Sequence, residues 1–79
     1  MKIEILGTGC PKCKKLTELV EEAVKELDIS AEIIKITDIN KIINYGVMMT
    51  PALVIDGEVK MAGKLPNKKD IINWIKNKN

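Results

Sequence analysis

Residues 2–13, Lys-Ile-Glu-Ile-Leu-Gly-Thr-Gly-Cys-Pro-Lys-Cys, carry the strongest local signals in the chain. Residues 2–6 are rich in isoleucine and end at Gly7, which is typical of a short β-strand. Residues 7–9 read as a turn. Pro11 then stands where a first helical residue is favoured, because the amide that proline lacks has no intrahelical acceptor there. The stretch therefore predicts a strand, a tight turn and a helix that begins between two cysteines.

The helix that begins at Pro11 is predicted to be amphipathic. Lysine and glutamate side chains occupy one face of the pattern. Apolar residues recur on the other face at the spacing of a helix, namely Leu16, Leu19, Val20, Ala23, Val24 and Leu27. We expect this apolar face to pack against a sheet.

The second half of the chain predicts two helices and three strands. Residues 31–36 are rich in isoleucine and predict a second strand, and Thr37 or Asp38 can cap a short helix that ends near Gly46. The unbroken apolar run at 52–55 is typical of a strand buried on both faces. Asp56-Gly57 is a strong hairpin signal, so residues 58–62, which alternate polar and apolar, predict a returning edge strand. Asn67 can cap a last helix whose inner face carries Ile71, Trp74 and Ile75.

These elements follow the order βαβαββα in a single domain spanning residues 1–79. A βαβ unit requires parallel strands joined by a right-handed crossover, whereas the Asp-Gly hairpin adds an antiparallel pair. We therefore expect an α/β fold with a four-stranded mixed sheet. The predicted strand order is 2-1-3-4, with three helices distributed over the two faces.

The composition excludes several classes of function. Apolar residues make up 46% of the 79 residues and charged residues 30%, and no apolar run approaches the ~20 residues of a membrane helix. The net charge is only +2, every basic residue is lysine, and the aromatic residues are Tyr45 and Trp74. These features argue against binding of nucleic acid, which uses clustered basic residues, arginine and aromatic stacking. We expect no membrane partner either.

The two cysteines indicate redox or metal chemistry. The N-terminal apolar stretch is too short for a signal peptide, so we expect a cytoplasmic protein. A bridge between Cys10 and Cys13 would close a loop of about four residues, worth only about 2 kcal/mol on the loop-entropy model. A structural disulfide would close a longer loop, and the cytoplasm disfavours structural disulfides. The Cys-x-x-Cys pair is therefore interpreted as functional.

The predicted position of Cys10 favours its thiolate. The start of a helix presents unpaired amide groups and the positive end of the helix dipole, and Lys12 adds positive charge nearby. We expect the pKa of Cys10 to fall below the ordinary thiol value of about 8.5. Since the thiolate is the attacking species in disulfide exchange, Cys10 is the predicted nucleophile. Cys13, one turn into the helix, is the predicted resolving cysteine. The cycle needs no histidine, and the chain has none.

A second candidate site lies directly before the third predicted strand. Pro51 cannot donate to a sheet, so it should mark the beginning of that strand. A cis Thr50–Pro51 bond would form a tight exposed turn and leave the backbone of Thr50 available to an extended substrate. Met48 and Met49 are suited to an adaptable substrate groove, although core filling or exposure in a loop is the plainer interpretation. The predicted substrate-binding residues are Thr50, Pro51, Met49 and Lys12.

Taken together, Cys10-Pro11-Lys12-Cys13, Thr50-Pro51, the Asp56-Gly57 hairpin and Gly63 resemble the thioredoxin/glutaredoxin superfamily, in particular its very small thioredoxin-like redox-active disulfide proteins. The resemblance covers essentially the whole chain. It implies that Cys10 attacks, that Cys13 resolves, and that a cis Pro51 faces the disulfide. It implies a thiol–disulfide oxidoreductase that reduces protein disulfides and is itself reduced by an upstream disulfide reductase. The redox-active disulfide would be its only redox group, and we expect a monomer.

Two departures from the family pattern refine this expectation. Proline follows the first cysteine, as in glutaredoxins, but Lys12 stands where glutaredoxins usually carry an aromatic residue. Gly63 is followed by Lys64, where glutaredoxins carry a second glycine that helps to hold glutathione. The sequence therefore argues against glutathione use and favours dithiol chemistry.

The alternative function is a carrier of soft metal ions. Gly-Thr-Gly before a Cys-x-x-Cys also resembles the loop of copper chaperones with a ferredoxin-like fold, and two thiolates suit Cu(I) or Zn(II). Those chaperones follow the order βαββαβ and end in a strand, whereas this chain is predicted to end in a helix. A structural zinc site needs four ligands, and one chain supplies two cysteines and no histidine. We therefore assign no metal-binding residue.

Overall fold

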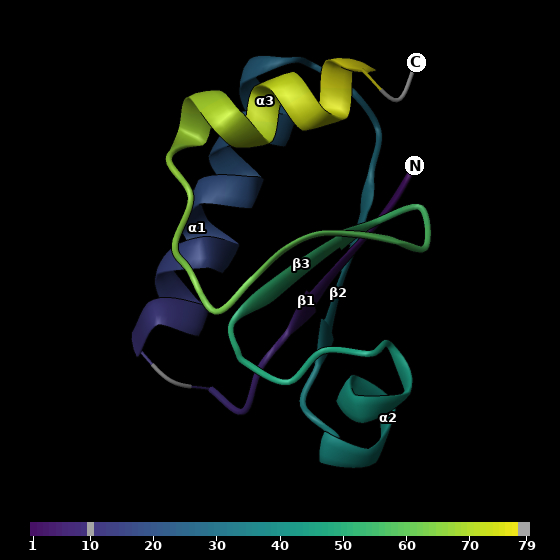
Figure 1. Ribbon diagram of the computed structural model, residues 1–79. Coiled ribbons are helices and arrows are strands. Elements are labelled where there is room, and N and C mark those ends of the chain that lie inside the picture. Colours follow the sequence, from purple (N-terminus) through teal and green to yellow (C-terminus); the bar gives the residue numbers. More distant parts are fainter. Residues whose placement is uncertain (10, 78–79) are drawn as a thin grey trace.

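The computed structural model describes residues 1–9 and 11–77. The elements follow the predicted order βαβαββα (Figure 1). They are β1 (Lys2–Leu6), α1 (Pro11–Glu26), β2 (Glu32–Ile36), α2 (Ile39–Asn44), β3 (Ala52–Ile55), β4 (Glu58–Ala62) and α3 (Lys68–Asn77). Because the order ends in α3, it differs from the βαββαβ order associated with the metal-carrier alternative.

The four strands form one mixed sheet in the order β2-β1-β3-β4, which confirms the predicted order 2-1-3-4. β1 is parallel to β2 and antiparallel to β3, and β3 is antiparallel to β4. In this register Ile5 lies opposite Lys35 on one side and Leu53 on the other. The central position of β1 brings its C-terminal end, where the cysteine loop begins, to the middle of one edge of the fold.

β1 separates two apolar cores because its side chains alternate between the two faces of the sheet. Ile3 and Ile5 pack with side chains of α1 and α3, whereas Leu6 packs with Ile42 of α2. The larger core consists of Ile3, Ile5, Leu16, Val20, Ala23, Leu53, Ile55, Ile71 and Ile75. The smaller core, under α2, consists of Leu6, Ile42, Val47, Ala52 and Val54. All four residues of β3 are buried, as the unbroken apolar run predicts.

The hairpin between β3 and β4 is confirmed, and β4 is an edge strand as predicted. Asp56 and Gly57 both have positive φ, 49° and 84°, as the tight hairpin turn suited to this sequence requires. The polar and apolar alternation of residues 58–62 did not indicate that the register shifts between Leu53 and Val54. Leu53 lies opposite Met61 and Val54 lies opposite Val59, so Lys60 is an extra residue. A bulge of this kind moves the residues beyond it to the other face.

The helix ends follow local sequence signals. Of the two candidates for the N-cap of α2, the structure uses Asp38, whose carboxylate accepts a hydrogen bond from the amide of Asn40 at 2.9 Å. The side chain of Asn67 accepts one from the amide of Asp70 at 2.8 Å, as predicted for α3. No helix within residues 1–9 and 11–77 combines the length and apolar character needed to cross a membrane.

Candidate redox site

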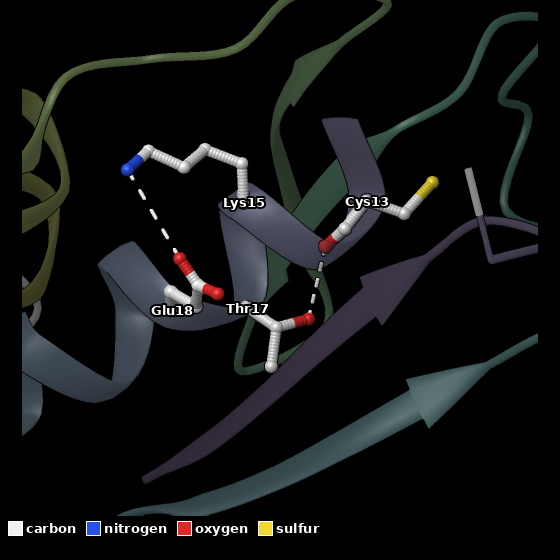
Figure 2. Close-up of polar contacts among 4 residues, drawn as sticks. All are labelled: Cys13, Lys15, Thr17 and Glu18. Atoms are coloured by element: carbon white, nitrogen blue, oxygen red, sulfur yellow. Dashed lines mark hydrogen bonds and ion pairs between the residues drawn. The ribbon is translucent and has the colours of Figure 1, made fainter. Parts of the chain in front are cut away.

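Cys13 lies in the first turn of α1, with its side chain pointing toward the chain that leaves β1 (Figure 2). Only 5% of its surface is exposed. Cys10, the predicted nucleophile, lies outside the described residues, so its role and its pairing with Cys13 stay predictions.

The first turn of α1 is held by its own polar contacts. The hydroxyl of Thr17 donates a hydrogen bond to the carbonyl of Cys13 at 3.0 Å, and this contact is buried. On the outer side Lys15 lies 4.0 Å from Glu18 (Figure 2). The first turn contains no acidic residue, and Lys12 and Lys14 are exposed there. The positive charge expected beside the cysteines is therefore present in the described part of this turn.

Gly7 makes the close approach of Cys13 to β1 possible. A Cβ atom at Gly7 would overlap the Sγ atom of Cys13, and it would lie 3.3 Å from its Cβ and 3.9 Å from the Cβ of Thr50. Only a glycine leaves room for the sulfur at this point. The same comparison shows that Cys13 and Thr50, 37 positions apart in the chain, both lie against Gly7.

Thr50 and Pro51 form the other side of the site. The Thr50–Pro51 peptide bond is cis, Pro51 is buried, and Thr50 is exposed. The carbonyl of Pro51 accepts a hydrogen bond from the amide of Gly63 at 2.9 Å. This bond ties the loop before β3 to the chain that leaves β4. Pro51 precedes β3, which begins at Ala52.

The two methionines before this loop point to different places. Met49 packs over Gly63, where an added Cβ would lie 3.0 Å from the Cβ of Met49 and 3.2 Å from its sulfur. Met48 is 91% exposed and lines a groove beside α2. The predicted substrate-binding residues Thr50, Pro51 and Met49 therefore belong to one loop, whereas Lys12 lies on α1.

A small cavity of about 130 Å³ lies beside Cys13. Its walls include Gly7, Thr17, Lys14 and Lys35. No group of three or more histidine, cysteine or acidic side chains that could hold a metal ion occurs in residues 1–9 and 11–77.

A buried carboxylate lies on the opposite face of the sheet. Glu4 is only 4% exposed, and its carboxylate accepts a hydrogen bond from the hydroxyl of Tyr45, the C-cap of α2. This hydrogen bond, with partial burial and the negative charge of Glu4, raises the pKa of Tyr45 above its ordinary value. The pair connects the end of α2 to the central strand, and α2 in turn leads into the Met48–Pro51 loop.

Sequence reasoning missed Gly7, Thr17, Lys35 and the contact between Glu4 and Tyr45. Gly7 carried a usable signal, because a glycine at the end of a strand often marks a close backbone approach. The other three depend on which strand or helix lies alongside. No local pattern specifies that neighbour.

Known proteins match almost the entire chain. The family model described as a thioredoxin domain matches residues 1–76. A thioredoxin of Methanothermobacter thermautotrophicus is 45% identical over 71 residues, which cover 90% of this chain and 92% of the relative. A thioredoxin of Methanocaldococcus jannaschii is 45% identical over 74 residues, covering 94% and 85%. A probable thioredoxin of Methanothermobacter marburgensis is 35% identical over 79 residues, covering 95% and 92%.

Proposed function

The chain belongs to the thioredoxin family, and on that premise we propose that it is a dithiol–disulfide oxidoreductase that reduces protein disulfides through Cys10 and Cys13. The observation that carries the proposal is the placement of Cys13. It lies at the start of α1 and against Gly7, and Gly7 also contacts the exposed Thr50, which precedes the cis Pro51. Thioredoxin relatives support an oxidoreductase role in general, and this arrangement supports the specific exchange.

The proposed cycle transfers two electrons to the substrate. The Cys10 thiolate attacks one sulfur of the substrate disulfide, so a Cys10–substrate bond forms, the substrate S–S bond breaks, and the leaving thiolate takes up a proton. Cys13 then loses its proton and attacks the Cys10 sulfur. The second substrate sulfur leaves as a thiol, and the protein retains a Cys10–Cys13 disulfide. An upstream disulfide reductase returns both electrons. We place this cycle in the cytoplasm, where such reductases keep thiols reduced.

Burial of Cys13 supports its assignment to the second step. Cys13 as a residue is only 5% exposed, which shields its thiol from external disulfides, whereas a mixed disulfide at Cys10, three positions earlier in the sequence, would offer it an intramolecular target. The lysines of the first turn of α1 and the helix dipole stabilise a thiolate formed there.

Trapping the mixed disulfide tests the proposal. Cys13→Ser should accumulate a covalent Cys10–substrate species with a disulfide-bonded protein such as insulin, because the resolving sulfur is gone. The adduct is detected by mass spectrometry and released by dithiothreitol. Cys10→Ser is the matched control and should form no adduct and lose turnover.

Retention of disulfide-reductase activity by Cys10→Ser would contradict the assignment. The assignment would also be contradicted if the wild-type protein reduced no disulfide and was purified with one equivalent of copper or zinc. The second result would support the soft-metal carrier instead.

A further inference from the structure

A hollow lies between α2 and the strands β1 and β2, apart from the redox site. It has a volume of about 420 Å³, which is within the range of sites that bind small molecules. None of the residues that line it belongs to the redox site. We call it the β1–β2 cavity. Its walls include Lys2 and Glu4 of β1, Ile34 and Ile36 of β2, and Lys41 and Tyr45 from the side of α2.

The carboxylate of Glu4 has an oxygen atom that is open to this cavity. Glu4 is only 4% exposed, and its Oε2 atom accepts the hydrogen bond from the hydroxyl of Tyr45. A carboxylate has a second oxygen with acceptor sites of its own. No fully buried side-chain oxygen in residues 1–9 and 11–77 lacks a hydrogen-bond partner, and no residue in those ranges donates to Oε1 of Glu4. It follows that Oε1 reaches open space, and the β1–β2 cavity is the space that Glu4 lines.

The charge of Glu4 is not compensated by a cation of the protein. In the part of the chain that the structure describes, the ion pairs involve other carboxylates. A buried charge without a partner costs free energy, so a cationic group that reaches it is stabilised there. Lys2 and Lys41 line the same cavity, but both side chains are exposed and neither forms an ion pair with Glu4.

The cavity therefore has two charged zones of opposite sign. The buried zone is negative at Glu4, whereas the exposed zone is positive at Lys2 and Lys41. Ile34 lies directly opposite Glu4 in the sheet and Ile36 lies two residues further along β2, so these side chains add an apolar wall on the same face.

We propose that the β1–β2 cavity binds a small zwitterion, with its ammonium group at Glu4 and its anionic group at Lys2 and Lys41. A short aliphatic stem between the two groups packs against Ile34 and Ile36. A simple cation complements the cavity less well because the lysines repel it, and a simple anion less well because Glu4 repels it. This binding site goes beyond the proposed redox function, and neither cysteine takes part in it.

Three matched probes test the charge pattern. The first, δ-aminovalerate, has an ammonium and a carboxylate at the two ends of an aliphatic stem, whereas pentylamine has only the ammonium and valerate only the carboxylate. Each is titrated into isotope-labelled protein while the amide chemical shifts are followed by NMR. We expect saturable shifts at Glu4, Ile34 and Tyr45, with a Kd of about 1 mM for δ-aminovalerate, a strength suited to so small a ligand. Pentylamine and valerate should each bind about tenfold more weakly, because each lacks one of the two charged contacts.

Variants distinguish the two ends of the site. Glu4→Gln keeps the shape of the side chain and removes its charge, so it should weaken binding of δ-aminovalerate about tenfold and leave valerate bound at least as tightly as before. Lys41→Gln should weaken δ-aminovalerate severalfold without weakening pentylamine. Lys69→Gln is the matched control, because Lys69 is exposed on α3, which packs on the other face of the sheet. It should leave the affinity for all three probes unchanged.

Several outcomes would overturn the proposal. One is equal affinity of the wild-type protein for the three probes, and another is valerate binding as tightly as δ-aminovalerate, which would indicate a site for simple anions. A third is the absence of saturable shifts at about 100 mM δ-aminovalerate, a hundredfold above the expected Kd. A fourth is wild-type affinity in Lys41→Gln, whose position is exposed and tolerant of substitution, so the test does not depend on the folding of Glu4→Gln.

Stability provides a second readout. A ligand that contacts β1, β2 and α2 together binds the folded chain and not the unfolded one, so δ-aminovalerate should raise the urea midpoint of the wild-type protein. The increase should be smaller in Lys41→Gln and unchanged in Lys69→Gln. An equal increase in wild type and Lys41→Gln would contradict the proposed contacts. None of these measurements requires disulfide reduction, so failure of the redox proposal and failure of this one are distinguishable.

Discussion

The α1–α3 face of the sheet and the α2 face bury very different amounts of apolar surface. Among the described residues, nine buried side chains from β1, α1, β3 and α3 meet under α1 and α3, and eight of them, Leu16 and Ile71 included, are fully inaccessible to solvent. The core under α2 has five members, and the helix above it exposes Ile39 and Ile43. Both faces meet at the end of β1.

The difference separates two roles that a redox protein has to combine. Cys13 belongs to the α1 side, where dense packing holds the sulfur against Gly7. The exposed apolar groove belongs to the α2 side, where a six-residue helix leaves side chains uncovered. Exchange chemistry needs fixed positions, whereas recognition of varied substrates needs accessible and adaptable surface. We infer that the thin core under α2 allows that accessibility.

The largest expected effect is a loss of stability, and it tests whether the core under α1 and α3 contributes more to folding than the core under α2. Leu16→Ala should lower the free energy of unfolding by about 4 kcal/mol, because it removes a fully buried side chain from the larger core. Ile42→Ala should cost less, about 2 kcal/mol, since α2 is partly exposed and can relax around the cavity. Urea denaturation of the reduced proteins measures both.

If Leu16→Ala and Ile42→Ala lowered the free energy of unfolding equally, the proposed difference between the two cores would be wrong. Where Leu16→Ala leaves too little folded protein, Ile71→Val and Ile42→Val provide the same contrast within the range of about 0.5–1.5 kcal/mol. Ile71→Val should again be the more costly of the two.

The next prediction concerns the contact between Gly7 and Cys13. Gly7→Ala should destabilise the reduced protein by about 2 kcal/mol and slow disulfide reduction, because the new methyl group overlaps the sulfur. Adding Cys13→Ala should recover most of the stability, since it removes the overlapping atom. Denaturation under dithiothreitol measures the coupling in a double-mutant cycle. Additive costs would show that the strain of Gly7→Ala arises elsewhere.

The smallest expected effect on stability concerns the hydrogen bond that connects α2 to the sheet. Tyr45→Phe should lower the free energy of unfolding slightly at neutral pH, because it removes the hydroxyl that donates to the buried carboxylate of Glu4. The raised pKa of Tyr45 means that its contribution is fully present below about pH 10, the ordinary tyrosine value, and is lost as pH rises through the folded-state pKa. The wild-type advantage over Tyr45→Phe should therefore disappear at strongly alkaline pH.

A surface ion pair provides the control for this prediction. Lys68 lies 2.9 Å from Glu26, and hydrogen bonding to that carboxylate raises the pKa of Lys68. Both groups are well exposed, so Lys68→Met should leave the free energy of unfolding almost unchanged. Because wild type and Tyr45→Phe both contain this pair, the difference between their pH profiles isolates Tyr45. A difference that persisted unchanged to strongly alkaline pH would argue against the hydroxyl's role.

Some elements could be predicted accurately from the sequence, whereas other features could not. β1 was predicted with its observed bounds, and the N-cap of α3 at Asn67 was predicted correctly, because both depend on a few adjacent residues. The bulge at Lys60 was missed, since it arises from how β4 pairs with β3. Tyr45 carried no interpretable signal in the sequence, because its partner is 41 positions away.

The sequence by itself determined the order of elements, the helix caps, the Asp56-Gly57 turn and the candidate pair Cys10 and Cys13. Periodicity, capping and turn formation act over a few residues, so these features can be read along the chain. Only the tertiary structure brought Thr50 and Cys13 together against Gly7, and only it placed Ile39 and Met48 around one groove. Those contacts depend on sheet pairing and core packing, which join residues that are distant in sequence and leave no local pattern.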